Sequence, residues 1–504
     1  MRINWNEPSF DEEDLKEVSQ VIRSAYINEG PKTKVLEEEI RKYLGVKHVL
    51  LTTNATAAIF MAVKADARIR GLKDFEVIVP DMTMIATANA VEWAGGKPVL
   101  VDVEKERMTI DVDKIKEKIT PKTIAIIPVH ILGRAADMKT IEELARRYGL
   151  SIIEDAAGAL GSKYNERFLG TFGKIGCFSL QSNKIVTCGQ GGILVTDDDK
   201  CYEVLRRIRD FGRMNNKEFM HQEIGYNLKF NDLSAALALS QFRKIEERKK
   251  LLLMQRSRYA YELNGIEQIK FFNFNDGEIP LWVDVAVDRR KELIEFLNSN
   301  DIYPREIWPA IHKNSPYRNQ GNDQDFPIAS YLSENVLWLP NGPAITSDQI
   351  SLICSKIREF YKKEKEMLIQ RTEKLEKPNF PMTEMEFKKI HEDKRGFIYL
   401  VKDLLENKKE FTFLEIKRGF ARGGCLHSKD EYYVVVKGKV KVICGNDEKE
   451  VSAGGSGLFP AFQPHAFIAI EDSIVSEWGI TTDEKEADVK DIKLRGTVDR
   501  ANLR

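Results

Sequence analysis

Two polar side chains stand at points of the sequence where covalent chemistry is feasible. Asp155 ends the apolar run IIED, and Lys184 follows 29 residues later within SLQSNKIVTCGQGG. A lysine among apolar and small residues is costly unless it is paired, neutralised or covalently engaged. The pattern leaves two interpretations open. One is a covalently engaged lysine near a ligand-binding aspartate; the other is an ordinary helix N-cap and a surface lysine at a turn.

A third segment, LTTNATAAIF, offers a phosphate site. It places Thr52 to Thr56 between an apolar run and a helical pattern. The first N–H groups of a helix have no partner within the helix, and the helix dipole favours negative charge there, so such a turn can hold a phosphate. Many strand–helix turns share this pattern, and the segment gains weight only beside the other two.

The elements that would carry these residues follow the rhythm of a parallel sheet covered by helices. Short apolar runs predict buried strands, and longer amphipathic runs between them predict helices. The strand candidates are HVLLTT, EVIVP, PVLVDV, TIAIIPV and LSIIED; the helix candidates are ATAAIFMAVKADARIRG, MIATANAVEWAG and MKTIEELARRYG. Asp155 then lies at the carboxyl edge of the sheet, where α/β proteins place ligands.

The rest of the chain divides into a smaller lobe, a linker and a β-rich region. A helical stretch from about Asn231 to Leu263, the strand-like PLWVDVAV, the helix RRKELIEFLNSN and a last helix near Ser347 to Lys363 predict an α+β lobe. The charged run KKEKEMLIQRTEKLEKP ends at a proline, as an interdomain linker does. Beyond it, short β-branched and aromatic runs between glycines predict an antiparallel β domain, closed or sandwiched. The predicted boundaries are residues 1–365 for the α/β unit (large domain about 1–250, small lobe about 251–365), 366–382 for the linker and 383–504 for the β domain.

Composition excludes several classes of protein. The 504 residues, 42% hydrophobic and 31% charged, suit a soluble globular protein. The 77 basic and 78 acidic residues lack the basic surplus of a nucleic-acid binder. No apolar run reaches the ~20 residues of a membrane span, and the N-terminus lacks a signal-peptide pattern. Six scattered cysteines without CxxC spacing indicate neither a disulfide framework nor a zinc ribbon. We expect a cytoplasmic protein with no nucleic-acid or membrane partner.

Residues 1 to about 365 resemble the DegT/DnrJ/EryC1/StrS family of pyridoxal phosphate-dependent nucleotide-sugar aminotransferases along their whole length. The resemblance rests on ordered segments that include ATAAI, DMTMIATANAVEWAGGKPVLVDV, PVHILGRAADM, EDAAGALGS, SLQSNKIVTCGQGG, IGYNLKFNDLSAALALSQ and WLPNGPAITSDQI. It implies the α/β fold of fold type I aminotransferases and a homodimer with sites at the subunit interface. It also implies pyridoxal phosphate as cofactor, a nucleotide-linked keto-6-deoxyhexose as acceptor and L-glutamate as amino donor, in amino-sugar biosynthesis for surface polysaccharide.

The resemblance assigns roles to individual residues of this chain. Lys184 is similar to the family's Schiff-base lysine, which also carries the proton between substrate and cofactor carbons. Asp155 resembles the aspartate that pairs with the pyridine nitrogen and keeps the ring an electron sink. The other implied contacts are Ala55 and Thr56 in the phosphate turn, Ser179 on the phosphate, Asn227 reaching the phosphate from the partner subunit, and His221 and His312 on the sugar-nucleotide side.

Three positions bear on the branch of the family. Lysine at position 184 favours transamination, because a sugar dehydratase branch carries histidine there. Gly158 stands where the family usually has Gln, Glu or His in contact with the cofactor, and Met84 stands where an aromatic residue commonly stacks on the ring. Methionine can cover a π face, though less specifically. Both departures favour an altered cofactor affinity or a divergent subfamily.

The β domain carries two spaced motifs that are similar to those of cupins. The first has Gly419, Cys425, His427, Glu431 and Gly438, and the second has Gly454, Pro460 and His465. Cys425 replaces the first cupin histidine, and Phe462 replaces a glycine. In a small barrel Cys425, His427, Glu431 and His465 would converge on one cavity and suit zinc, iron or a similar divalent ion. The alternative is a buried cysteine and a hydrogen-bonded histidine without metal.

The segment RGGCLHSKDEYYVVVKG also resembles the sugar-nucleotide 3,4-ketoisomerase cupins, which use an HxH pair and no metal. His427 matches the second histidine and is the catalytic candidate of this domain, with His465, Glu431 or Tyr433 as its partner.

Two alternatives to a plain aminotransferase therefore stay open. One is a bifunctional enzyme whose cupin isomerises or epimerises the keto sugar; the other is a cofactor-binding regulatory protein without turnover. The sequence does not distinguish GDP, dTDP and UDP, or C3 from C4 amination.

Overall fold

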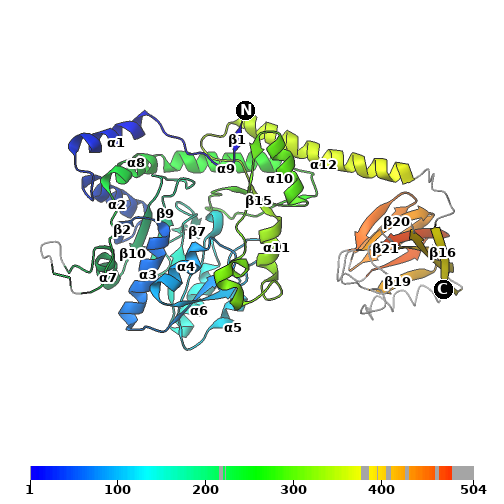
Figure 1. Ribbon diagram of the computed structural model, residues 1–504, viewed down its shortest axis with the longest axis horizontal. Helices are drawn as coiled ribbons and strands as arrows, with labels where there is room; N and C mark the ends of the chain where they lie inside the picture. Colours follow the sequence, from blue (N-terminus) through cyan, green and yellow to red (C-terminus); the bar gives the residue numbers. More distant parts are fainter. Residues whose placement is uncertain are drawn as a thin grey trace. The chain divides into compact units, whose positions relative to one another are not determined.

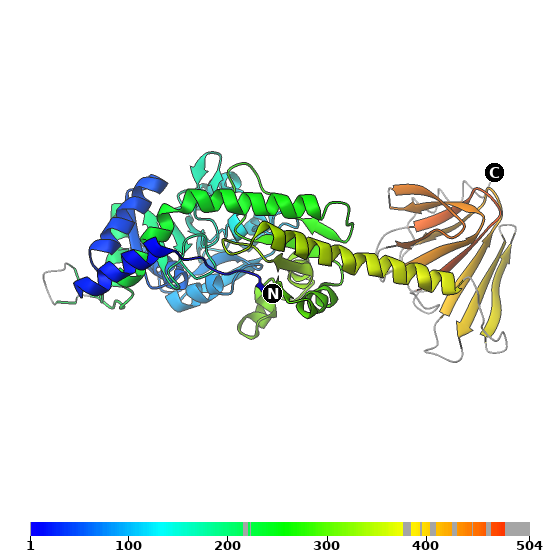
Figure 2. The ribbon, with the colours of Figure 1, turned by 90° about the horizontal axis from the view of Figure 1, so that it is seen from above.

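The computed structural model describes residues 2–214, 220–221, 223–375, 385–393, 396–403, 410–425, 431–445, 447–459 and 465–478 (Figures 1 and 2). Within these ranges, the side chains of 363–375, 385–393, 396–403, 410–413, 423–425 and 478 are not described. The chain forms two compact units, Met1–Gln370 and Arg371–Arg504. In the described part of the chain, no helix combines the length and the apolar character needed to cross a membrane.

A seven-stranded sheet forms the centre of the first unit. Its order is β2-β10-β9-β6-β5-β3-β4. Strand β10 runs antiparallel to both of its neighbours, and the other pairs are parallel. The strands are β2 His48–Thr52, β3 Glu76–Pro80, β4 Lys97–Val101, β5 Thr123–Ile126, β6 Ser151–Asp155, β9 Ile175–Ser179 and β10 Gly192–Thr196. The five predicted strands are confirmed as β2 to β6.

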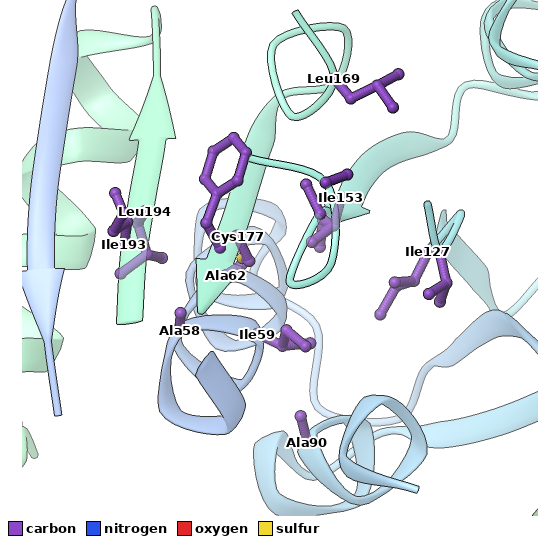
Figure 3. Packing of buried hydrophobic residues seen from close by; sticks show 14 of the residues in the cluster. Ala58, Ile59, Ala62, Ala90, Ile127, Ile153, Leu169, Cys177, Ile193 and Leu194 are labelled. Carbon is purple, nitrogen blue, oxygen red and sulfur yellow. The ribbon is translucent and has the colours of Figure 1, made fainter. Parts of the chain in front are cut away.

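Side chains of the sheet alternate between two cores. Val77 of β3 belongs to a core that also contains residues of α3, whereas Ile78 packs with Met138 of α6 in a separate cluster. Figure 3 shows Ala62 of α3 beside Cys177 of β9 in the first of these cores. A sheet buried on both faces explains why its strands read as continuous apolar runs. The helices of this part are α1 Glu12–Ser24, α2 Pro31–Leu44, α3 Ala55–Arg70, α4 Ala86–Ala94, α5 Val112–Lys118, α6 Met138–Tyr148, α7 Asp199–Arg209 and α8 Asp232–Arg243.

A four-stranded antiparallel sheet, ordered β11-β12-β15-β14, forms the smaller lobe around a core of its own. Its strands are β11 Ile269–Phe271, β12 Val283–Val287, β14 Arg305–Glu306 and β15 Val336–Leu339, and its helices are α9 Ile245–Glu262, α10 Arg290–Ser299, α11 Pro327–Asn335 and α12 Ser347–Leu375. Strand β1 (Ile3–Asn4) pairs in parallel with β13 (Ile302–Tyr303), so the start of the chain is fixed to this lobe. The remaining short elements are β7 Lys163–Tyr164, β8 Arg167–Phe168, η1 Ile131–Gly133, η2 Ile311–Lys313 and η3 Ser315–Gln320.

Two predicted helices have different bounds in the structure. The helical stretch predicted from about Asn231 to Leu263 is confirmed, and in the structure it is divided at Lys244 into α8 and α9. Lys244 leaves the helical conformation at φ −95° and ψ 6°, and its Nζ lies 2.7 Å from a carboxylate oxygen of Asp11. The last helix continues to Leu375, so the first part of the linker predicted at 366–382 is helical.

Beyond the end of α12, two antiparallel sheets make up the described part of the second unit, as the sequence predicts for a cupin domain. Their orders are β16-β17-β18-β25-β20-β23 and β19-β24-β21-β22. The strands are β16 Met385–Asp393, β17 Gly396–Asp403, β18 Glu410–Ile416, β19 Ala421–Cys425, β20 Glu431–Lys437, β21 Lys439–Cys444, β22 Asp447–Ser452, β23 Ser456–Phe459, β24 His465–Ala469 and β25 Ser473–Trp478. Val435, Val440 and Phe467 are among the residues of their shared core.

Candidate active site

A cavity of about 480 Å³ lies at the carboxyl ends of β6 and β9. Seven of the predicted cofactor contacts line it: Ala55, Thr56, Met84, Asp155, Gly158, Ser179 and Lys184. These residues come from four separate segments of the sequence, and the fold brings them to the sheet edge where α/β proteins bind ligands.

Asp155 is the last residue of β6 and is 5% exposed. Its carboxylate accepts hydrogen bonds from Thr87 Oγ1 at 2.7 Å and from the N–H of Ala157 at 3.1 Å. Burial raises the pKa of this carboxyl, and the two hydrogen bonds and the nearby Lys184 amine oppose that shift. A buried carboxylate is stabilised by a cation beside it. The site therefore suits a ligand that presents a protonated nitrogen to Asp155.

Lys184 lies in the loop between β9 and β10, and its Nζ is 5.1 Å from the ring centre of Trp282. The residue is half-buried, and the protein atoms around the amine exclude enough water to lower its pKa to about 8, although the charge of Asp155 opposes the shift. An amine of this kind is partly neutral near pH 8. Neutral amines are the nucleophilic form, so Lys184 is suited to covalent attachment of a carbonyl ligand.

The first turn of α3 forms the wall of the cavity beside Ser179. Asn54 is the N-cap, and its side chain accepts a hydrogen bond from the N–H of Ala57 at 2.9 Å. The N–H groups of Ala55 and Thr56 precede that capped position, where a helix supplies no partner. Two backbone donors at the positive end of a helix, with a serine hydroxyl nearby, fit a phosphate group.

Two glycines shape this cavity through close backbone approaches. A Cβ at Gly192 would lie 2.4 Å from the carbonyl oxygen of Asn54, so only glycine lets β10 support the phosphate turn. A Cβ at Gly158 would lie 3.3 Å from the backbone nitrogen of Leu132. Leu132 has a φ of 55° in η1 and thus approaches the place where the side chain usual in the family would begin. A side chain at position 158 would therefore require η1 to give by a few tenths of an ångström.

Sequence reasoning missed several residues of the cavity wall: Trp93, His130, Trp282, Arg305, Trp308 and Trp338. The three tryptophans of the smaller lobe form one cluster, with ring centres 4.3 Å apart for Trp282 and Trp338 and 4.8 Å apart for Trp308 and Trp338. The only sequence feature that could have indicated this cluster is the tryptophan in each of PLWVDVAV, EIWPAIH and VLWLP. Each tryptophan alone is compatible with an ordinary core position.

His130 supports the end of the strand that carries Asp155. Its backbone N–H donates to the carbonyl of Asp155 at 3.0 Å. The buried ring accepts a hydrogen bond at Nδ1 from the N–H of Ala136 at 3.3 Å, and its Nε2 lies 2.8 Å from a carboxylate oxygen of Glu154. The Nδ1 contact places a proton on Nε2, which donates to Glu154. His130 is thus a candidate for fixing the position of Asp155 at the end of β6.

The two predicted sugar-side histidines and Asn227 do not line this cavity within the single chain. His312 is 3% exposed, with Nδ1 2.6 Å from Asp81 Oδ2 and Nε2 2.9 Å from Asp323 Oδ1. Both ring nitrogens therefore contact carboxylates, which joins the smaller lobe to the end of β3. His221 and Asn227 are exposed. Their expected roles toward the sugar nucleotide and a partner subunit stay predictions.

A second candidate site lies in the cupin unit, where three buried groups gather: Glu431, His465 and Glu477. Their ligand atoms all lie within 4.8 Å of one another. His465 Nε2 is 2.9 Å from Glu431 Oε2, and the imidazole stacks on Phe459 with ring centres 4.0 Å apart. Glu477 stands outside both motifs and was not predicted. Strand pairing places Cys425 opposite His465. The Cys425 side chain and the whole of His427 lie outside the described residues.

Comparisons with known proteins agree with this division. Residues 8–358 match the DegT/DnrJ/EryC1/StrS aminotransferase family, and residues 414–478 match the cupin domain. GDP-perosamine synthase of Vibrio cholerae is 30% identical over 362 residues, which cover 70% of this chain and 98% of that protein. The spore coat polysaccharide biosynthesis protein SpsC of Bacillus subtilis is 30% identical over 380 residues, which cover 70% of this chain and 96% of SpsC.

Solved structures give the same fold for the aminotransferase part. DesV of S. venezuelae, solved in complex with a ketimine intermediate, matches with a TM-score of 0.65 at 29% identity, covering 69% of this chain and 94% of DesV. Helicobacter pylori PseC, an aminotransferase involved in the biosynthesis of pseudoaminic acid, matches with a TM-score of 0.68 at 22% identity, covering 72% of this chain and all of PseC. The second match is a likeness in fold alone.

Proposed function

Because the chain belongs to the DegT/DnrJ/EryC1/StrS aminotransferase family, we propose that it transfers an amino group from L-glutamate to a nucleotide-linked keto-6-deoxyhexose. The observation that carries the proposal is the convergence of Lys184, Asp155 and the first turn of α3 on one cavity. The similarity to GDP-perosamine synthases and to SpsC supports an amino-sugar product used for surface polysaccharide. The family's homodimer, with Asn227 reaching the partner's site, is part of the proposal.

The donor set of the cavity fits pyridoxal phosphate, the cofactor of this family. The N–H groups of Ala55 and Thr56 and the hydroxyl of Ser179 would hold the phosphate, and Asp155 would pair with the ring nitrogen. Met84 and Gly158 would border the ring. When bound, pyridoxal phosphate supplies an electron-withdrawing ring that stabilises negative charge on a carbon next to the transferred nitrogen.

Lys184 has two tasks in this proposal, both at its Nζ. The neutral amine attaches the cofactor covalently. Once released, the same amine takes a proton from one carbon and returns it to another, which is general base and general acid catalysis by one group. Its lowered pKa suits both tasks, because an amine that titrates near the working pH can accept and donate protons with little cost.

The direct test supplies the cofactor-loaded protein with L-glutamate and, in separate reactions, GDP-, dTDP- and UDP-linked 4-keto-6-deoxyhexoses. We expect an amino sugar and 2-oxoglutarate in equal amounts with one of the three nucleotides, identified by mass spectrometry. Consumption of glutamate without an amino sugar would contradict the acceptor class. A protein that binds the cofactor but releases no 2-oxoglutarate would instead be the regulatory protein that the sequence left open.

The grouping of Glu431, His465 and Glu477 favours a second function in the cupin. We propose that it holds a divalent metal ion, with Cys425 and His427 as further ligands predicted from the sequence. Carboxylate and imidazole are common ligands of zinc and iron. Two buried carboxylates also need a compensating positive charge, which a divalent ion provides.

We expect the purified protein to retain close to one divalent ion per chain and the His465→Ala variant to lose it, as measured by elemental analysis after gel filtration. Lys200→Ala, an exposed substitution in the other unit, is the matched control and should retain the ion. A metal-free protein that still isomerises the keto sugar in the presence of a chelator would contradict the metal site. In that case His427, with His465, Glu431 or Tyr433 as its partner, would act in proton transfer, as the ketoisomerase resemblance implies.

A further inference from the structure

The loop that carries Lys184 is held by side chains from outside it. Within the loop, the N–H of Lys184 donates to the carbonyl of Gln181 at 3.0 Å, which closes a tight turn. The carbonyls on either side of Lys184, those of Asn183 and Ile185, instead accept hydrogen bonds from distant residues. The position of the Lys184 amine therefore depends on these distant residues as well as on the strand that precedes the loop.

Trp282 holds the first carbonyl. Its indole Nε1 donates to the Asn183 oxygen at 3.2 Å, and the face of the same ring lies 5.1 Å from Lys184 Nζ. Trp282 is 1% exposed and packs among Trp5 and Trp338, with ring centres 5.0 Å and 4.3 Å away. These neighbours leave the indole little freedom to rotate, so one ring fixes both the backbone before Lys184 and the surface beneath its amine.

Arg248 of α9 holds the second carbonyl. Its Nη1 donates to the Ile185 oxygen at 2.8 Å, and its Nη2 donates to the carbonyl of Ser9 at 3.3 Å. The side chain is 8% exposed. A buried guanidinium that bridges two backbone carbonyls holds them at a fixed relative position, because the planar group keeps both hydrogen bonds in one geometry. The loop is thereby tied to α9 and to the segment at the start of the chain.

We propose that Trp282 and Arg248 are positioning residues that clamp the Lys184 loop from its two sides and hold the amine at the cavity. This inference rests on the proposed function, which makes Lys184 the residue that attaches the cofactor and moves the proton. Trp282 directly precedes β12 and Arg248 belongs to α9, so both clamp residues belong to the smaller lobe. The orientation of the amine therefore depends on the smaller lobe being packed in place.

The chain offers a matched pair of variants for this test. Trp282→Phe keeps an aromatic ring but removes the indole N–H that holds Asn183. Trp338→Phe makes the same chemical change in the neighbouring ring, whose Nε1 has no hydrogen-bond partner among the described residues. A comparison of the two separates the loss of the clamp from the loss of packing.

The first readout uses the cofactor-free protein, so it does not depend on turnover. Competitive acetylation of Lys184 across a pH series, followed by peptide mass spectrometry, gives the pH of half-maximal labelling. We expect a midpoint near pH 8 in the parent and in Trp338→Phe. In Trp282→Phe the released amine should titrate at least about one unit higher, toward the ~10.4 of a solvated lysine. An unchanged profile in Trp282→Phe, or an equal shift in both variants, would overturn the clamp.

The second readout uses the cofactor-loaded protein. Poor placement of a proton-transferring group lowers kcat more than it changes KM, so Trp282→Phe should lose about 10- to 100-fold in kcat at a nearly constant KM for glutamate. A loss of the same size in kcat/KM that came from a higher KM for glutamate would contradict a positioning role. If thermal unfolding shows that Trp282→Phe is not folded, Arg248→Met is measured in the same way. Arg248→Lys is then expected to recover part of the activity that Arg248→Met loses. A parent that labels as expected but never attaches the cofactor would refute the proposed function and leave the clamp standing.

Discussion

Replacing Lys184 by alanine is expected to reduce amino transfer by at least about 10⁴-fold while the protein stays folded. Lys184 is the one lysine among the described residues that line the cavity, so no neighbour can take over its amine. Its side chain is half-buried in a loop and contributes little core packing. The free energy of unfolding should therefore change by less than about 1 kcal/mol. Steady-state kcat and urea unfolding, measured on the same preparation, test both parts.

Two further variants sharpen this result. Lys184→Arg keeps a positive charge near Asp155 but cannot attach a carbonyl ligand, so it should be as inactive as the alanine variant. Lys200→Ala removes an exposed lysine of α7 and should retain full activity. An alanine variant at position 184 that transaminated at a normal rate would contradict the assignment of this residue.

Replacing Asp155 by asparagine should lower kcat by about 10²- to 10³-fold, the range found when one preorganised electrostatic contact is removed. Asparagine has nearly the same shape and can still accept the hydrogen bond from Thr87 Oγ1. It lacks the charge that would keep a ring nitrogen protonated. The expected loss therefore reports the charge rather than packing, and kcat with saturating cofactor measures it. An asparagine variant within a few-fold of the parent would show that Asp155 does not pair with the cofactor.

The pH dependence of the Thr87→Val variant tests how the hydrogen bond from Thr87 shifts the pKa of Asp155. The hydrogen bond from Thr87 favours the charged carboxylate, and burial favours the neutral acid. Thr87→Val removes that bond, so the pKa of Asp155 should rise further and the neutral acid should persist to higher pH. Activity that needs the carboxylate will then fall at a higher pH on the acid side than in the parent. An acid limb that moved to lower pH in the kcat profile would contradict this account.

The sheet and its ligand edge could be predicted because their causes are local. Buried strands such as EVIVP must be apolar on both faces, and a strand that ends in Asp155 places a carboxylate at the edge. The break at Lys244 has no such local sign. The apolar pattern continues across it, and the side chain of Lys244 reaches Asp11, a residue far away in the sequence. Distant ion pairs of this kind are not visible in a window of sequence.

The parts of the site that were missed depend on contacts between distant segments. Trp282, Trp308 and Trp338 gather only when the smaller lobe folds, and His130 gains its role from Glu154 and Asp155 beside it. His312 lies in a segment that the family resemblance associates with the sugar, but burial between two carboxylates could not be read from that segment. Likewise Glu477 of β25 and His465 of β24 belong to different sheets, so their approach depends on the packing of the two sheets rather than on motif spacing.

The measurement that tests the central claim most directly is the visible absorbance of the cofactor-loaded protein before and after addition of L-glutamate. We predict a visible band from the cofactor joined to Lys184, which glutamate converts to the near-ultraviolet band of pyridoxamine phosphate. The same band should be absent from Lys184→Ala. A parent protein without the band after incubation with pyridoxal phosphate, or a band that glutamate leaves unchanged, would contradict an aminotransferase that works through Lys184.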